Sequence, residues 1–168
     1  MIVITNPSSI ANEISIIDSL FEEGLSLLHI RKPDFSELEM ALFIHQIKLR
    51  FRANLVLHSH HELAQDFGIN RIHFPEKQRK EVFEIARENK IISTSVHSIE
   101  TFNALHPNFE YAFLSPVFKS ISKENYELPH RVGIRESRNA CGGYNCSTGN
   151  YSSISPVFSK NNFWCKNQ

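Results

Sequence analysis

The sequence contains the stretch Leu27-Leu28-His29-Ile30-Arg31-Lys32-Pro33, a short apolar run that ends abruptly in basic residues. A second stretch of this kind is Leu114-Ser115-Pro116-Val117-Phe118-Lys119-Ser120-Ile121-Ser122-Lys123. A buried parallel strand that opens into a functional loop has this pattern, because both of its faces are covered until the chain emerges. Basic groups at two such points predict a site for a small anion.

The chain from residue 1 to about residue 126 alternates between short β-branched runs and longer stretches with helical periodicity, which predicts strand-helix repeats on a parallel sheet. We expect six strands, at Ile2–Thr5, Leu27–Ile30, Leu55–Leu57, Arg71–Phe74, Ile91–Ser95 and Tyr111–Leu114. Three intervening stretches have apolar residues at helical spacing and should cover the sheet: Ile10, Ile14, Ile17 and Phe21; Leu38, Ala41, Leu42 and Leu49; and Val82, Ile85 and Ala86. Ser36 and Glu39 form a capping-box pattern at the start of the second helix, and Pro75 suits the start of the fourth.

These repeats predict an α/β fold of the TIM-barrel type with about six parallel strands. The barrel should be incomplete, because the chain has 168 residues and a full eightfold barrel needs roughly 200 or more. Residues 127–168 form a tail of different character, without any leucine after Leu128 and with all three cysteines, and we expect it to be loosely structured. Our hypothesis is that the chain is truncated or read out of frame after about residue 126, which would expose sheet edges that favour homo-oligomers.

The composition excludes several classes of function. Lys plus Arg and Asp plus Glu are both 18, so no polybasic field for nucleic acid or an acidic membrane exists. The N-terminal apolar run is too short for a signal peptide, which predicts a cytoplasmic protein. Cys141, Cys146 and Cys165 match neither a zinc ribbon nor a disulfide framework.

The candidate site residues follow from the geometry of parallel strands, whose C-terminal ends share one face. The polar residues expected there are His29, Arg31, Lys32, His58, Ser59, His73, Ser95, His97 and the segment 115–123.

At these residues the chain resembles the thiamine-phosphate synthase and thiazole tautomerase (TenI-like) family of TIM-barrel proteins. The resemblance covers residues 2 to about 125 and rests on His29-Ile30-Arg31, His58 to Ala64, Arg71-Ile72-His73-Phe74, Ser95-Val96-His97-Ser98 and the segment 114–123. It implies a transferase that joins hydroxymethylpyrimidine pyrophosphate to thiazole phosphate with Mg²⁺ and releases pyrophosphate.

The resemblance also implies roles for individual residues. Arg31 and Lys123 would contact the pyrophosphate, Ser95 and His29 would border the pyrimidine, and Ser120 and Ser122 would approach the thiazole phosphate. We group Arg31, Lys123 and Ser95 as catalytic, and His29, Lys32, His58, His97, Ser120 and Ser122 as substrate-binding. The family motif has a second cation at the position that Pro33 takes here, so that cation is either displaced to Lys32 or lost.

The departures from the family pattern concern the metal. Synthases have an Asn-Asp pair where this chain has His58-Ser59, and an Asp where it has Gln78. Mg²⁺ prefers carboxylate oxygens, so although the family implies Mg²⁺, we identify no metal ligands in the sequence.

Three alternatives stay open. A thiazole tautomerase is favoured by Ser95 to Ser98, although that branch has a catalytic His where this chain has Pro116. A non-catalytic phosphate-ligand binder, or an inactive family member, is favoured by the missing acidic ligands. A metal hydrolase could use His58, His60 and His61, but a catalytic zinc set needs further ligands that the sequence does not identify.

Overall fold

The computed structural model describes residues 1–81, 90–115 and 157–159, and the chain divides into two compact units, Met1–Ile92 and Ser93–Gln168. Each unit is described by itself below.

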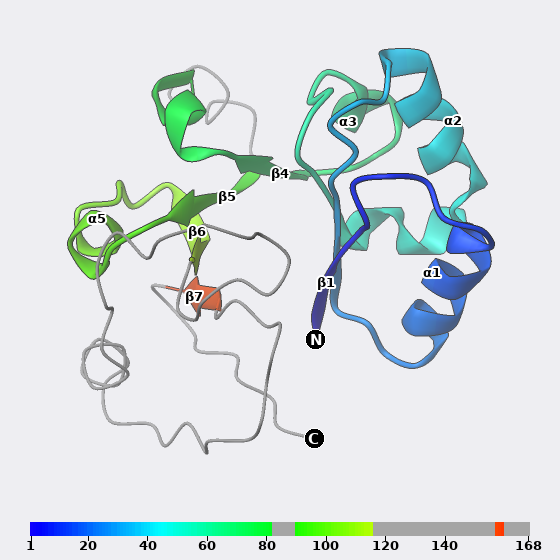
Figure 1. The fold of residues 1–168 in the computed structure, drawn as a ribbon, viewed down its shortest axis with the longest axis horizontal. Helices are drawn as coiled ribbons and strands as arrows, with labels where there is room; N and C mark the ends of the chain where they lie inside the picture. Colours follow the sequence, from blue (N-terminus) through cyan, green and yellow to red (C-terminus); the bar gives the residue numbers. More distant parts are fainter. Residues whose placement is uncertain (82–89, 116–156, 160–168) are drawn as a thin grey trace. The chain divides into compact units, whose positions relative to one another are not determined.

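The first unit is built on parallel strands that follow one another in chain order: β1 (Ile2–Ile4), β2 (Leu27–Ile30), β3 (Leu55–Leu57) and β4 (Arg71–Phe74) (Figure 1). The register pairs Ile4 with His29, His29 with Val56, and Leu57 with Ile72. Strand β5 (Ile91–Val96) begins in this unit, where the Ile91 amide donates to the Asn70 carbonyl at 2.8 Å. The four predicted strands of this unit are confirmed.

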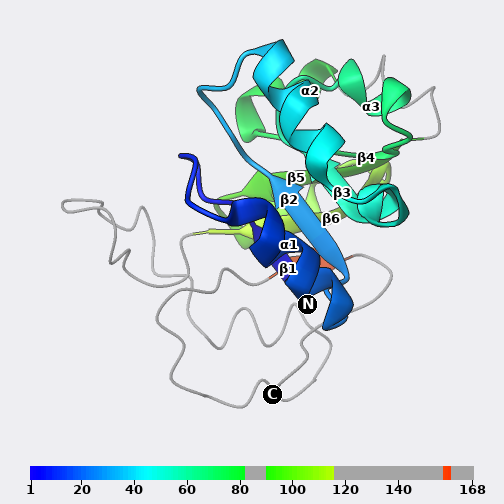
Figure 2. The same cartoon turned by 90° about the vertical axis from the view of Figure 1, so that its right-hand side faces the viewer.

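Helices connect these strands. They are α1 (Glu13–Glu22), α2 (Glu37–Gln46), α3 (Leu63–Asp66) and two 3₁₀ segments, η1 (Leu49–Asn54) and η2 (Glu76–Glu81). Figures 1 and 2 show α1 and α2 on the same side of β1. The predicted capping box is confirmed: the Glu39 amide donates to Ser36 Oγ at 3.3 Å, and the Ser36 amide donates to the Glu39 carboxylate at 2.8 Å. After Pro75 the chain enters the 3₁₀ segment η2, with the Gln78 amide donating to the Pro75 carbonyl, and the apolar residues of the predicted fourth helix lie outside the described residues.

The buried face of α2 differs from the predicted one. Leu38 and Leu42 are 68% and 55% exposed, whereas Met40 and Ile44 are fully buried; Leu49 lies beyond α2, in η1, and is 74% exposed. Both pairs have helical spacing, so α2 carries two apolar stripes, and the prediction of Leu38 and Leu42 as the buried one is wrong. The core of this unit consists of this buried stripe together with Leu28, Ile30, Leu55 and Leu57 of the strands and Ile17 and Phe21 of α1, all of which are buried. Ile10 also lies outside α1 and is exposed, while Val82, Ile85 and Ala86 lie outside the described residues.

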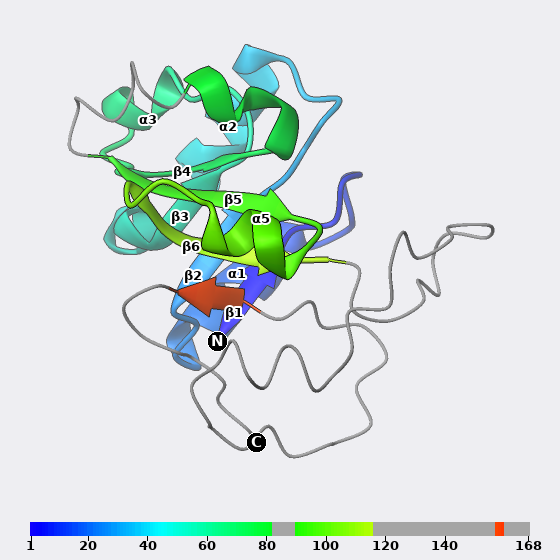
Figure 3. The same ribbon diagram turned by 90° about the vertical axis from the view of Figure 1, so that its left-hand side faces the viewer.

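The second unit contains the end of β5, then α5 (Ile99–Asn103), β6 (Phe109–Leu114) and β7 (Val157–Ser159) (Figure 3). The Ser115 amide donates to the Val96 carbonyl at 3.0 Å, which joins the ends of β5 and β6. Strand β7 pairs antiparallel with β6, with Phe158 opposite Ala112. The fifth and sixth predicted strands are confirmed, but we did not predict β7, which comes from the tail.

The fold class is confirmed as α/β with six strands β1 to β6 in (β/α) order, of the incomplete TIM-barrel type. The rest of the tail lies outside the described residues. Among the helices of the described ranges, none has the length and apolar character that a membrane span requires.

Candidate functional site

Three histidines from neighbouring strands of the first unit meet on one face of its sheet. His29 lies in β2, His58 directly follows β3, and His73 lies in β4. Side chains alternate along a strand, so His29 and His73 point away from the aliphatic face that Ile30 and Ile72 occupy. Since Leu57 is in register with Ile72, the next residue, His58, comes beside His73. The strand pattern therefore accounts for the cluster.

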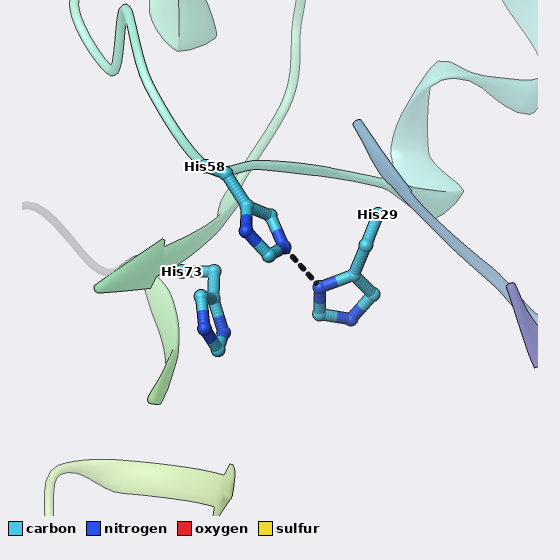
Figure 4. A group of neighbouring side chains, drawn as sticks. All are labelled: His29, His58 and His73. Atoms are coloured by element: carbon cyan, nitrogen blue, oxygen red, sulfur yellow. Dashed lines mark hydrogen bonds between the residues drawn. The ribbon is translucent and has the colours of Figure 1, made fainter. Parts of the chain in front are cut away.

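The three rings are in close contact (Figure 4). His29 Nδ1 and His58 Nε2 lie 2.9 Å apart and share a hydrogen bond, in which one ring donates and the other accepts. The rings of His58 and His73 are stacked with centroids 4.2 Å apart, and those of His29 and His73 are edge-on at 5.6 Å. His29 is fully buried, His73 is 3% exposed, and His58 is half-buried.

Burial keeps all three imidazoles neutral. The pKa of His29 is lowered to about 3, first by desolvation and then by repulsion between its protonated ring and the positive charges of a protonated His73 and of Arg71. Desolvation also lowers the pKa of His73 to about 3, with a contribution from His61. The pKa of His58 is lowered most strongly, first by desolvation and then by neighbouring charges that include His73 and Arg31. At neutral pH the cluster is therefore an uncharged set of nitrogen donors and acceptors.

Arg31 supplies positive charge beside this cluster. It directly follows β2, its side chain is exposed, and its charge is close enough to lower the pKa of His58. Its backbone amide donates to Thr5 Oγ1 at 2.9 Å, which ties the loop after β2 to the end of β1. The guanidinium is thus available to an anion at the C-terminal end of the sheet.

Lys32 has a partner within the protein. Its side chain is fully buried, and Nζ donates to both carboxylate oxygens of Glu13 at 2.8 Å and to the Ser8 carbonyl at 2.9 Å. The rings of Phe35 and Phe43 lie 5.6 and 5.3 Å from Nζ. This ion pair anchors the start of the loop after β2 to α1, and a contact between Lys32 and substrate stays a prediction.

In the second unit, the predicted site residues lie at the end of β5. Ser95 is half-buried within the strand, and His97 follows it with an exposed side chain. His97 Nδ1 donates to the carbonyl of Ser115, the residue after β6. Ser98 caps α5 by accepting a hydrogen bond from the Thr101 amide at 3.1 Å. Neighbouring strand ends in this unit are therefore joined by an imidazole.

The structure sorts the predicted residues as follows. It brings His29 and His58 together and places Arg31 near them, whereas Lys123, Ser120, Ser122 and Pro116 lie outside the described residues. His73, which the sequence placed among the polar residues at the strand ends without a role in substrate binding, is the third member of the cluster. The alternation of side chains along the strands could have identified it, because His29 and His73 are each the third residue of their strand and so lie on the same face of the sheet.

The hydrolase set of His58, His60 and His61 is not the group that the described residues assemble. His60 Nε2 donates to the Phe35 carbonyl at 2.8 Å and Nδ1 faces the Glu62 carboxylate at 3.3 Å. The potential ligand group consists instead of His29, His58 and His73.

The residues at the strand ends do not fit Mg²⁺. The positions after β3 and β4 that the family uses for acidic ligands hold His58, Ser59 and the exposed Gln78. The potential ligand group among the described residues offers nitrogen atoms alone, whereas Mg²⁺ requires oxygen ligands in octahedral geometry.

Comparisons with known proteins agree with this architecture. The family described as thiamine monophosphate synthase matches residues 1–148. The crystal structure of a thiamine phosphate pyrophosphorylase from Bacteroides thetaiotaomicron is similar with a TM-score of 0.61 and 32% identity, covering 70% of this chain and 58% of that one. The chain thus spans less than two thirds of that protein's length. No curated protein matches the chain.

Proposed function

Since the chain belongs to the thiamine monophosphate synthase family, we propose that it is a synthase-type transferase. It would join hydroxymethylpyrimidine pyrophosphate to thiazole phosphate and release pyrophosphate. The observation that carries the proposal is the exposed Arg31 guanidinium beside the neutral His29 and His58 at the end of the sheet. This combination suits a ligand with an anionic part and an uncharged heterocyclic part.

The leaving group requires positive charge, because pyrophosphate departs with the bonding electrons and its developing charge must be stabilised. Within the first unit, Arg31 is the proposed source, since its planar guanidinium binds phosphate oxygens in a bidentate manner. A neutral imidazole, that of His29 or of its half-buried partner His58, can donate or accept a hydrogen bond to a pyrimidine ring without adding charge. Lys123 as the second cation, and Ser95, Ser120 and Ser122 as further contacts, complete the proposal.

The first test is binding of inorganic pyrophosphate to the full chain in the presence of a chelator, measured by isothermal titration calorimetry. A hydrogen bond to a charged group contributes about 1.5–3 kcal/mol, so Arg31→Ala should weaken binding roughly 10- to 100-fold. Arg50→Ala is the matched control, because Arg50 is an exposed arginine of the same unit that pairs with Glu22. Equal losses in both variants, or no loss in either, would contradict the role of Arg31.

Turnover then separates the proposed activities. Thiamine phosphate should form from the two substrates, and Arg31→Ala should abolish most of this formation. Pyrophosphate binding without any turnover would instead identify the non-catalytic binder.

A second candidate is the thiazole tautomerase, favoured by the contact between His97 and the Ser115 carbonyl. A tautomerase needs a group that can move a proton, and His97 places an imidazole at the end of β6, next to the position where that branch carries its catalytic His. Conversion of the thiazole carboxylate tautomer in the absence of the pyrimidine substrate would support this activity. If His97→Gln retained that conversion, His97 would not be the proton-transfer group.

A further inference from the structure

The cluster of His29, His58 and His73 has the arrangement of a metal-ligand set. One nitrogen from each ring belongs to a group whose members all lie within 4.8 Å of one another. In a tetrahedral site with Zn–N bonds of about 2.0–2.1 Å, neighbouring ligand nitrogens are roughly 3.3–3.4 Å apart. The 2.9 Å pair of His29 and His58 would therefore open slightly, and wider pairs would close by up to about 1.5 Å. Side-chain rotations of this size leave the strands in place.

The ligand chemistry selects the class of ion. Three nitrogen donors without a carboxylate suit zinc, copper, nickel or cobalt and disfavour the hard ions Mg²⁺ and Ca²⁺. Three imidazoles also leave a fourth coordination position for water or another ligand, as in catalytic rather than structural zinc sites. We propose that His29, His58 and His73 bind a divalent transition-metal ion, with Zn²⁺ as the representative, through three imidazole nitrogens.

Two nearby arginines affect which ligands the site would bind. The charge of Arg31 acts on His58 and that of Arg71 acts on His29. Both weaken the binding of a bare dication and favour an anionic fourth ligand, such as hydroxide or a phosphate oxygen. The metal site is an inference independent of the transferase proposal, since it needs neither substrate, and it differs from the sequence analysis, which identified no metal ligands.

The test is Co²⁺ and Zn²⁺ binding by the full chain after treatment with a chelator. Co²⁺ should produce the visible absorption of a tetrahedral nitrogen site, and Zn²⁺ should displace it with a stoichiometry of one. Zn²⁺ affinity is then measured by competition with a chromophoric chelator. Replacing an outer hydrogen-bond partner of a metal ligand costs roughly 10- to 100-fold in affinity, so His58→Gln and His73→Gln should each cost more than a hundredfold.

The matched control is His61→Gln, because His61 is close enough to lower the pKa of His73 but is not a member of the group. Its Zn²⁺ affinity should match that of the natural chain. A loss in His61→Gln as large as that in His73→Gln would overturn the proposal, as would full affinity in both cluster variants. A cobalt spectrum dominated by sulfur charge transfer would assign the metal to Cys141, Cys146 or Cys165 and would also overturn it.

If either cluster variant fails to fold, the natural chain provides the second measurement. Zn²⁺ should raise its melting temperature, since a ligand that binds only the native state stabilises it by mass action. Zinc-induced changes in the NMR signals of three histidine rings should accompany that rise. Changes confined to other histidines would reject the site.

Discussion

Glu13→Gln should be among the most destabilising single substitutions in the first unit. Both carboxylate oxygens of Glu13 accept from Lys32 Nζ at 2.8 Å, and the Lys32 side chain is fully buried. The substitution leaves the ammonium with neutral acceptors alone, the Ser8 carbonyl and the new amide oxygen, and places an amide NH₂ group near it. Removing one member of a buried ion pair costs about 3–5 kcal/mol, because the remaining charge is neither solvated nor paired.

A control on the same helix isolates burial as the cause. Glu22 also pairs with cations, Lys48 and Arg50, but these three side chains are 52%, 49% and 60% exposed. Exposed pairs contribute about 0–1 kcal/mol because solvent screens them. Glu22→Gln therefore removes the same charge from α1 at a small cost.

Urea unfolding followed by far-UV circular dichroism measures the difference. With an m-value of about 2 kcal/mol per M, Glu13→Gln should lower the midpoint by roughly 1.5–2.5 M, and Glu22→Gln by less than about 0.5 M. The double variant Glu13→Gln with Lys32→Met should recover much of the loss, because it removes the uncompensated charge. The reasoning is refuted if Glu13→Gln and Glu22→Gln unfold at the same urea concentration.

Three other predictions concern stability. In the presence of a chelator, the free energy of unfolding should fall as the pH drops from about 6.5 towards 3. The pKa values of His29 and His73 are about 3 in the folded chain and ordinarily 6.5, so the unfolded chain binds more protons in this range. Each of the two residues should lower the free energy of unfolding by about 1.4 kcal/mol per pH unit. Urea titrations at pH 7, 6 and 5 should show this slope, and His29→Gln should reduce it; a pH-independent stability would contradict the neutral buried state. Ser36→Ala should destabilise the first unit by about 1 kcal/mol, because α2 loses its N-terminal cap. An unchanged urea midpoint would show that this cap does not contribute to stability. Ile44→Ala should lower the free energy of unfolding by about 2–5 kcal/mol and Leu42→Ala by less than about 0.5 kcal/mol, since Ile44 is fully buried and Leu42 is 55% exposed. The reverse order would show that α2 buries the stripe of Leu42 instead.

The strands were predictable because each is a short apolar run bounded by polar residues, and the β2, β3 and β4 boundaries agree with the structure. The capping box was equally predictable from the sequence, because the side chains of Ser36 and Glu39 accept hydrogen bonds from each other's backbone amides. The core face of α2 was not, because Leu38 and Leu42 repeat with the same period as Met40 and Ile44. Only packing against the sheet distinguishes two apolar stripes of equal period.

The contacts within the histidine cluster could not be predicted from the sequence, because they depend on how the strands pair. His29 and His58 are 29 positions apart, and the sequence placed both near the same strand ends. Their direct hydrogen bond and the stacking of His73 depend on register, which the sequence alone does not specify. The partner of Lys32 was also hidden, because Glu13 lies on α1 and nothing in the sequence ties that helix position to the loop after β2.

The two proposals for the first unit make different demands on the same group of residues. Without a metal, the neutral histidines leave Arg31 as the charge that would hold pyrophosphate there, so chelators should leave binding unchanged. With a metal, the cluster would gain two positive charges and an open coordination position, so pyrophosphate affinity should rise with Zn²⁺ and should depend on His73. Measuring pyrophosphate affinity with and without Zn²⁺, in the natural chain and in His73→Gln, therefore separates anion binding by the guanidinium from anion binding by a metal.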